Sequence, residues 1–326
     1  MIIQTATIGD VILATPIIES IALADPSIQI DFLLRKGAET LFAGHPYLRN
    51  VFVWDKSQHK YPGLMHILKS IRETHYDIII DLHRFISSGF VTTFSKARYK
   101  IGFNKNPLSF LFDKRVKHII GKSSELHEVD RNLMLIRDIF KPVRTIKLYP
   151  SNTDFANVKA YKSVPFITIA PSSLWGTKKY PEEKWIEFIE ALPVGFKIYL
   201  IGSNSDIDLC NRIARKCVKH DIQNLSGIFS LLETAALMKD AHMNFTNDSA
   251  PQHLASAMNA PITGVFCSTV PEFGFGPLSD ISFIVETEEK LYCRPCGLHG
   301  YRTCPEKHFK CAYDIKKEQL LVCLPS

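Results

Sequence analysis

The stretch Phe245-Thr-Asn-Asp-Ser-Ala-Pro-Gln-His-Leu-Ala255 has the pattern of a strand that turns directly into a helix. Residues 241–246 form a short, largely apolar run typical of a strand. Polar residues 247–249 then make the turn, and Pro251 suits the first turn of a helix. Such a junction presents free backbone N–H groups and the positive end of a helix dipole, both of which favour phosphate. Asn, Asp and Ser also occur there simply as helix caps, so the stretch alone leaves both interpretations open.

The alternation of strand and helix patterns continues along the whole chain. The expected strands span residues 2–5, 28–34, 50–54, 76–82, 166–170, 197–202, 241–246 and 261–266. The expected helices span about 11–23, 64–74, 126–140, 181–192, 206–219, 230–239, 251–258 and 314–324. This alternation predicts an α/β fold in which helices cover both faces of parallel sheets.

A break in the pattern predicts two domains. Residues 142–164 are polar, contain Pro142 and Pro150 and show no strong period, so we place the boundary there, with domains at 1–155 and 156–326. We expect the last helix, 314–324, to pack back across the domains. Two such domains would leave a cleft between them, and ligands of such sheets bind at the carboxyl ends of the strands.

Composition indicates a globular chain that can bury a core. It has 326 residues, of which 46% are hydrophobic, and its mean hydropathy is zero. No apolar run approaches the roughly 18 residues that span a bilayer. The start, Met1-Ile-Ile-Gln-Thr5, lacks the charged region of a signal peptide. We therefore expect a cytoplasmic location.

The net charge of +6 comes from the first half of the chain. One acid, Asp113, accompanies nine basic residues in the segment 84–122, which we call the basic segment: Arg84, Lys96, Arg98, Lys100, Lys105, Lys114, Arg115, Lys117 and Lys122. Aromatic residues are interleaved with them. The segment is either an ordinary solvated surface or a surface for an anionic partner such as a membrane face or a phosphorylated substrate. Nucleic acid fits less well, because no recognisable nucleic-acid module accompanies the charge.

Two further strand-end loops carry residues suited to chemistry. Asp10 follows the first strand, where a carboxylate can act as a general base or simply cap the next helix. Ser172, Ser173 and Lys178 lie in the loop 171–181, where hydroxyls and an ammonium group can bind a diphosphate. The chain has neither a P-loop nor a GxGxxG pattern, which argues against kinase and NAD-dependent functions.

Together these motifs resemble the ADP-heptose:lipopolysaccharide heptosyltransferases, glycosyltransferase family nine. The resemblance is carried, in order along the chain, by Ile8-Gly-Asp-Val-Ile-Leu-Ala-Thr-Pro16, Pro171-Ser-Ser with Lys178-Lys-Tyr-Pro181, Leu225-Ser-Gly with Ser230-Leu231, Asn247-Asp-Ser-Ala-Pro-Gln-His253, and Phe266-Cys-Ser-Thr-Val-Pro271. It implies a GT-B fold, in which an acceptor-binding N-terminal domain and a nucleotide-sugar-binding C-terminal domain face a central cleft. It also implies an inverting, metal-independent transfer from an ADP-sugar to an anionic, lipid-linked core saccharide, made at the inner face of the membrane.

The resemblance also implies roles for individual residues. Asp10 would be the base and Lys178 would neutralise donor charge. Donor contacts would come from Ser172, Ser173, Asp206, Phe229, Asp248, Ser249, Ala250 and His253. Asp206 would bind the ribose, Phe229 would border the adenine, and Asp248 would hold the transferred sugar. Ala250 departs from the family pattern, which has glycine there, so the phosphate geometry is expected to differ slightly.

A cysteine cluster lies near the C-terminus. Cys293, Cys296, Cys304 and Cys311 have spacing suited to a closed tetrahedral zinc site, and His299 and His308 lie nearby. Reduced, inert thiols and, in an exported chain, disulfides are the alternatives. Similar clusters occur in relatives of the family.

Two other functions remain open from the sequence. One is a sugar-nucleotide epimerase of the same architecture, and the other is a non-catalytic nucleotide-sugar-binding protein.

Overall fold

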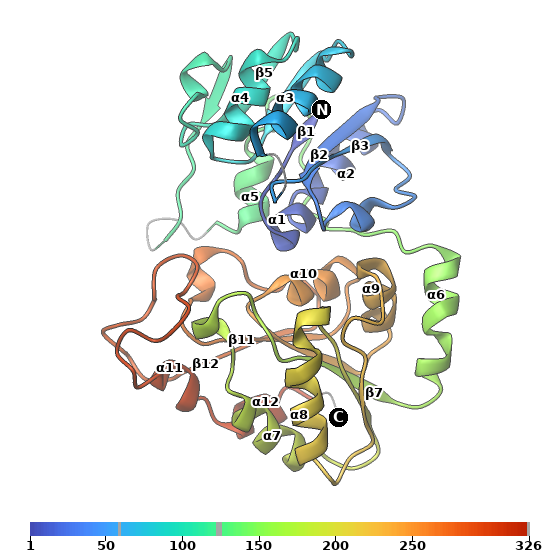
Figure 1. Cartoon of the computed structure of the whole chain (residues 1–326), viewed down its shortest axis with the longest axis vertical. Helices are drawn as coiled ribbons and strands as arrows, with labels where there is room; N and C mark the ends of the chain where they lie inside the picture. The colour runs from blue at the N-terminus through green and yellow to red at the C-terminus, as the bar shows by residue number, and fades with distance from the viewer. Residues whose placement is uncertain (58–59, 122–125, 325–326) are drawn as a thin grey trace. The chain divides into compact units, whose positions relative to one another are not determined.

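The computed structural model describes residues 1–57, 60–121 and 126–324, and it divides the chain into two compact units (Figure 1). The first unit spans Met1–Tyr149 and the second Pro150–Ser326. The division falls six residues before the predicted boundary of 155/156. Lys122 of the basic segment lies outside the described residues.

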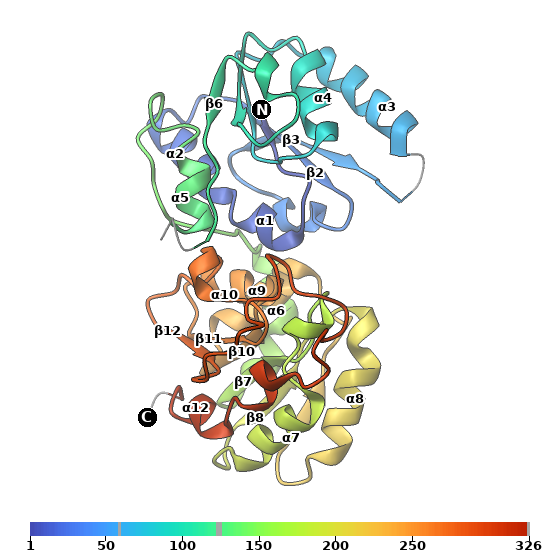
Figure 2. The ribbon, with the colours of Figure 1, turned by 90° about the vertical axis from the view of Figure 1, so that its left-hand side faces the viewer.

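The first unit is built on one parallel six-stranded sheet in the order β3-β2-β1-β4-β5-β6. Its strands are β1 (Ile2–Ile3), β2 (Ile30–Arg35), β3 (Leu48–Trp54), β4 (Ile78–Asp81), β5 (Tyr99–Phe103) and β6 (Lys114–Val116). Its helices are α1 (Ile8–Ile12), α2 (Thr15–Ala24), α3 (Lys60–Arg72), α4 (Ile86–Phe94) and α5 (Glu128–Leu133). Figure 2 shows α2 and α5 on one side of the sheet and α3 and α4 on the other.

The second unit repeats this topology. Its parallel sheet has the order β12-β11-β10-β7-β8-β9. The strands are β7 (Phe166–Ala170), β8 (Lys197–Leu200), β9 (Ile222–Asn224), β10 (Met243–Asn247), β11 (Ile262–Phe266) and β12 (Ser282–Glu286). The helices are α6 (Asn152–Val158), α7 (Glu182–Ala191), α8 (Ile207–Lys216), α9 (Leu231–Lys239), α10 (Ala250–Ala257), α11 (Lys310–Tyr313) and α12 (Lys317–Leu321).

Each unit has its own apolar core. In the first, Ile3, Leu33 and Ile79 from the sheet pack with the α3 residues Leu64 and Ile71. In the second, β7, β8 and β10 supply the buried apolar side chains of Ile167, Ile169, Ile198, Leu200, Met243 and Phe245. Helix α12 packs against α7 inside this unit, where Leu320 and Cys323 join the core.

Several predicted elements differ from the observed ones. The helix predicted over 11–23 is divided into α1 and α2, and the helix predicted over 314–324 is shortened to α12. The single helix predicted over 126–140 ends at Leu133, because the backbone then tightens into turns that bury Leu135 and Ile136. In those turns Leu135 N–H donates to Asn132 and Ile136 N–H to Leu133, three residues back. Conversely, the polar stretch 142–164 contains α6.

The strand orders define where each unit is suited to bind a ligand. The connections leave in opposite directions from β1 and β4 in the first unit, and from β7 and β10 in the second. At such a switch point the loops after neighbouring strands separate and leave a crevice at their carboxyl ends. Asp10 follows β1, Lys178 follows β7, and Asp248 follows β10.

No helix among the described residues is both long enough and apolar enough to cross a lipid bilayer.

Candidate active site

Lys178 and Asp248 form a close ion pair at the switch point of the second unit. Lys178 Nζ lies 2.5 Å from Asp248 Oδ2, and both side chains are largely buried. Thr269, which follows β11, donates its hydroxyl to the same carboxylate oxygen at 2.6 Å. Three neighbouring strand ends therefore supply one charged cluster, which can offer a cation to phosphate and a carboxylate to sugar hydroxyls.

Asn247 fastens the loop that carries Lys178 to the end of β10. Its side-chain oxygen accepts from the N–H of Tyr180 at 2.8 Å, and its amide donates to the carbonyls of Ala170 and Ser172 at 3.5 and 3.3 Å. The residue is fully buried. A buried amide with these partners holds the loop in one register relative to the helix that follows.

The start of α10 has the geometry expected of an anion site. Ser249 is the N-cap, but its hydroxyl donates to the carbonyl of Asn247 at 3.2 Å instead of capping the helix. Ala250 is the first helical residue and so has ordinary helical backbone angles. The alanine therefore needs no left-handed conformation, and the departure from glycine introduces no backbone strain. His253 is buried one turn further along the helix.

Ser172 and Asp206 line an open pocket of about 510 Å³, together with residues from the starts of α7 and α8. Burial favours a higher pKa for Asp206, but hydrogen bonds from Ser172 and Ser203 outweigh it and lower the pKa. Asp206 also completes a capping box with Ser203. The carboxylate is thus charged and held beside a pocket, as a ribose-binding group would be.

Two other predicted donor contacts lie apart from that pocket. Ser173 is half-buried and does not line it. Phe229 packs edge-on against Tyr161, with ring centroids 5.2 Å apart, and does not line it either.

In the first unit, Asp10 caps the start of α1 and has a perturbed pKa. Its Oδ2 accepts from the N–H of Thr7 at 2.9 Å and from the Thr7 hydroxyl at 2.5 Å. Burial raises the pKa of Asp10, Thr7 opposes the rise, and the nearby Glu128 carboxylate adds to it. Both interpretations of this residue from the sequence are therefore compatible with its geometry, because a capping carboxylate with a raised pKa can also accept a proton.

A buried charged cluster near Asp10 was not predicted from the sequence. His118 Nε2 lies 3.2 Å from Glu128 Oε2, Arg131 Nε donates to that oxygen at 2.6 Å, and Arg84 Nη1 lies 2.9 Å from His118 Nδ1. Burial alone would raise the pKa of Glu128, but His118 and the arginines lower it. No sequence pattern marks this cluster, because its members are up to 47 residues apart and meet only through the sheet order.

The basic segment divides between core and surface. Phe103 and Phe112 are buried, whereas Phe85 and Phe110 are 63% and 66% exposed. Most of its described cations are exposed or partly exposed, and Lys114 pairs with Asp138 at 2.9 Å. The described part of the basic segment therefore exposes both cations and apolar rings.

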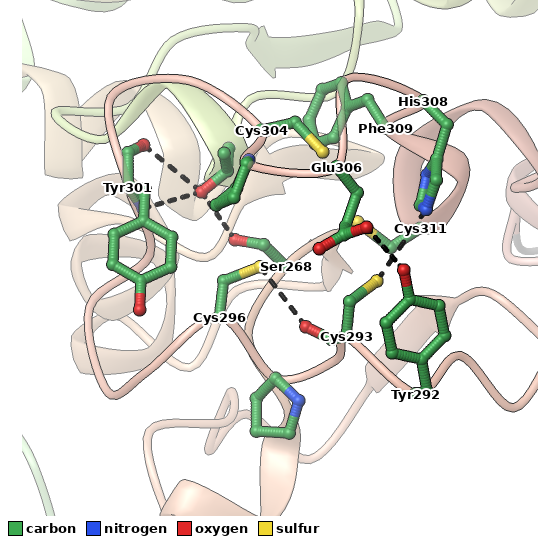
Figure 3. Close-up of a pocket in the computed structure, with 13 residues that line it drawn as sticks. Ser268, Tyr292, Cys293, Cys296, Tyr301, Cys304, Glu306, His308, Phe309 and Cys311 are labelled. Carbon is green, nitrogen blue, oxygen red and sulfur yellow. Dashed lines mark hydrogen bonds between the residues drawn. The ribbon is translucent and has the colours of Figure 1, made fainter.

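The cysteine segment encloses a smaller pocket of about 220 Å³, lined by Cys293, Cys296, Cys304 and Cys311 and by His308 (Figure 3). All four cysteines are free thiols, and Cys293 Sγ lies 3.9 Å from His308 Nε2. As the side chains stand, no three His, Cys, Asp or Glu residues in the described part of the chain converge closely enough to hold a metal ion.

Comparisons with known proteins place these features in a family. The profile of glycosyltransferase family 9 (heptosyltransferase) matches residues 64–307. Lipopolysaccharide heptosyltransferase 1 of Pseudomonas aeruginosa is 24% identical over 98% of this chain and 92% of its own length. Lipopolysaccharide heptosyltransferase 3 of Escherichia coli K12 is 25% identical over 80% of both chains.

Solved structures match the fold. Escherichia coli ADP-heptose lps heptosyltransferase II superposes with a TM-score of 0.80 at 20% identity, covering 99% of this chain and 96% of that one. A glycosyl transferase family 9 protein of Veillonella parvula gives 0.85 at 18% identity, covering 99% and 94%. Two six-stranded parallel sheets with helices are the GT-B architecture of these enzymes, which confirms the predicted fold class. The chain belongs to glycosyltransferase family 9, the heptosyltransferases.

Proposed function

We propose that this enzyme transfers a heptose, or a related sugar, from an ADP-sugar to the core saccharide of lipopolysaccharide with inversion at the anomeric carbon. The observation that carries the proposal is the Lys178–Asp248 pair beside the start of α10, at the switch point of the second unit. A cation and a helix N-terminus suit a diphosphate, and the carboxylate suits the hydroxyls of a sugar. A related Escherichia coli heptosyltransferase, WaaC, was solved with ADP-2-deoxy-2-fluoro heptose.

In this proposal the two domains divide the substrates. The domain predicted at 1–155 binds the acceptor and provides Asp10, and the domain predicted at 156–326 binds the donor. Ser172 and Asp206 would bind the ribose side of ADP from their shared pocket. Ser249, Ala250 and His253 would meet the diphosphate at α10, and Ser173 and Phe229 would complete the contacts.

The chemistry is a direct displacement. Asp10 takes the proton of the acceptor hydroxyl as its oxygen bonds to the anomeric carbon. The bond from that carbon to the diphosphate oxygen breaks at the same time, and its electron pair leaves with ADP. Negative charge therefore grows on the diphosphate, where Lys178 and the helix N-terminus stabilise it more strongly in the transition state than in the bound donor. No step in this scheme requires a metal.

We infer the acceptor-binding surface from the positive charge of the basic segment. The basic segment would bind the anionic, lipid-linked saccharide and hold the enzyme peripherally at the inner membrane face, with the protein otherwise cytoplasmic and without a nucleic-acid partner. Exposed Phe85 and Phe110 support an amphipathic partner.

A structural zinc ion is a separate proposal. Four free thiols around one pocket have the donor chemistry of a tetrathiolate site, but they must turn inward to make it. Metal analysis of protein purified under reducing conditions tests this. About one equivalent of zinc supports the site, and its absence with every thiol titratable removes it.

The experiment that tests the function combines ADP-heptose with a heptose-deficient lipopolysaccharide acceptor. Release of ADP that depends on the acceptor is the expected result. Epimerised donor would favour the epimerase, and tight binding without any product would favour a binding protein. A screen of nucleotide sugars then identifies the donor.

Replacing Asp10 tests the proposed base. Asp10→Asn keeps an oxygen that can accept from Thr7 but cannot take a proton, so kcat should fall by about 10²–10⁴-fold. The affinity for ADP, measured by titration calorimetry, should hardly change because the proposal assigns Asp10 to the acceptor and not to the donor. Turnover near the wild-type value would contradict the role.

A further inference from the structure

The cysteine-rich segment contacts the loop that carries Lys178 and also the turn after β11, whose Thr269 bonds to Asp248. We propose that residues 293–302 form a brace that sets the position of this pair, with Thr177 and Arg294 as its positioning residues. The inference rests on the proposed function, because it assigns the brace to the same donor site.

Thr177 joins the Lys178 loop to the brace. Its N–H donates to the carbonyl of Tyr301 at 3.0 Å. Its hydroxyl accepts from the Tyr301 N–H at 2.8 Å and from the Ser268 hydroxyl at 2.9 Å, and donates to the Tyr301 carbonyl at 3.2 Å (Figure 3). A hydroxyl has one proton and two acceptor positions, so all of its hydrogen-bonding capacity is used. Thr177 is 2% exposed, which makes each lost partner costly.

Two glycines let the brace approach this loop closely. A Cβ atom at Gly176 would lie 2.0 Å from the carbonyl oxygen of Arg302, which is backbone and cannot move aside alone. Gly300 has φ +78°, and a Cβ there would lie 2.9 Å from the Thr177 hydroxyl. The residues immediately before Thr177 and Tyr301 are therefore glycines, which permit direct backbone contact.

Arg294 joins the brace to the second loop. Its largely buried guanidinium donates to the carbonyls of Cys267 and Thr269 at 2.8 and 2.7 Å, and pairs with Glu286 at 2.5 Å. The first two acceptors lie directly after β11 and flank Ser268. Because a planar guanidinium reaches several acceptors in fixed directions, Arg294 fixes this turn in a way that a lysine cannot.

The two contacts meet at the ion pair. Ser268 bonds to Thr177, the neighbour of Lys178, while Thr269 bonds to Asp248. A shift of the brace would therefore move both charges relative to a bound diphosphate. Displacement of a catalytic group by about 1 Å is enough to lower a rate by up to 10²-fold.

Substitutions at Thr177 test the brace in the full-length enzyme. Thr177→Val should lower kcat by about tenfold or more with a smaller change in KM, and Thr177→Ser should restore most of the loss because it keeps the hydroxyl. Arg294→Lys should resemble Thr177→Val. Thr168 is a matched control: it is fully buried in β7, and its hydroxyl donates to Asn244 at 2.6 Å. Thr168→Val should lower thermal stability but leave kcat per folded molecule unchanged.

A double-mutant cycle with Lys178→Ala shows whether Thr177 acts through the lysine. In the Lys178→Ala background, Thr177→Val should have a clearly smaller effect on kcat and on ADP affinity than in the wild-type background, because only the displacement of Asp248 remains. If Thr177→Val is fully active while Lys178→Ala is impaired, the brace proposal is wrong and the donor role of Lys178 stands. The same conclusion follows if the loss caused by Thr177→Val persists undiminished in the double variant. An unimpaired Lys178→Ala enzyme would remove the proposed donor role of the lysine and the brace with it.

Discussion

Asp10 caps a helix, and the proposed function also assigns it the role of the base. Both hydrogen bonds from Thr7 go to Oδ2, so the proposal assigns proton transfer to Oδ1. Burial and the charge of Glu128 raise the pKa of Asp10, and the Thr7 bonds restrain that rise. A base with a higher pKa accepts a proton more readily but loses its charge at a higher pH.

The pH dependence of turnover should follow from this balance. Since protonated Asp10 cannot act as a base, kcat should fall as pH decreases through its raised pKa, and the acid limb should lie above the ordinary aspartate range. Thr7→Val removes the hydroxyl bond that stabilises the carboxylate, so it should raise the pKa further and shift the acid limb of the kcat profile to higher pH. The measurement is kcat against pH at saturating substrates, with Ser27→Ala as a surface control at an unrelated Asp–Ser pair. A shift to lower pH would contradict the assignment.

The roles of single residues could be predicted only where they lie within a short sequence motif. Lys178 is predicted as a catalytic group that neutralises donor charge and Asp248 as a donor contact, and the structure brings the two together because β7 and β10 are neighbours. Asn247 lay within the quoted motif, but its role in fastening the Lys178 loop depends on that pairing. Arg294 acts on carbonyls some 25 residues earlier, and no pattern in the sequence indicates this.

Largely apolar strands were predicted well, whereas several short or partly polar elements were not. The strand predicted at 166–170 agrees with β7, and those at 241–246 and 261–266 agree with β10 and β11 to within two residues. Strands β5, β6, β9 and β12 were missed because they are partly polar, and β6, β9 and β12 also lie at sheet edges. Helix α6 was also missed, although Ser151 and Asp154 form a capping box that marks its start.

Helix α10 allows a test of the residue that departs from the family pattern. Since Ala250 already has helical backbone angles, Ala250→Gly relieves no strain and adds chain entropy to the unfolded state. We expect a loss of about 0.5–1 kcal/mol in the free energy of unfolding. The affinity for ADP should stay within about twofold of wild type. Denaturant unfolding and calorimetry measure both, and a clear gain in ADP affinity would instead indicate that the alanine methyl obstructs the phosphate.

At the scale of the whole molecule, the proposed function assigns the two halves of the reaction to the two units that repeat the same strand order. Every predicted donor contact lies in the second unit, and Asp10 and the basic segment lie in the first. Each unit has a complete six-stranded sheet and its own apolar core. The second unit therefore contains all the groups that ADP binding should need, but it lacks the proposed base.

A fragment of residues 150–326 should fold by itself, bind ADP with an affinity within a few-fold of that of the full chain, and transfer no sugar. The boundary is critical because Ser151 caps α6, which packs against α9 and bonds to it through Asn157 and Glu233. A fragment of 156–326 would begin inside α6 and lose its capped first turn, which is worth about 1 kcal/mol, together with part of its contact with α9. It should therefore unfold at a lower temperature than the longer fragment.

Thermal unfolding and ADP titration of both fragments measure these differences. The full-length Asp10→Asn enzyme is the control, because it should bind ADP but not transfer sugar. A well-folded 150–326 fragment without ADP affinity would show that the first unit contributes to the donor site, and it would contradict the division of substrates proposed here.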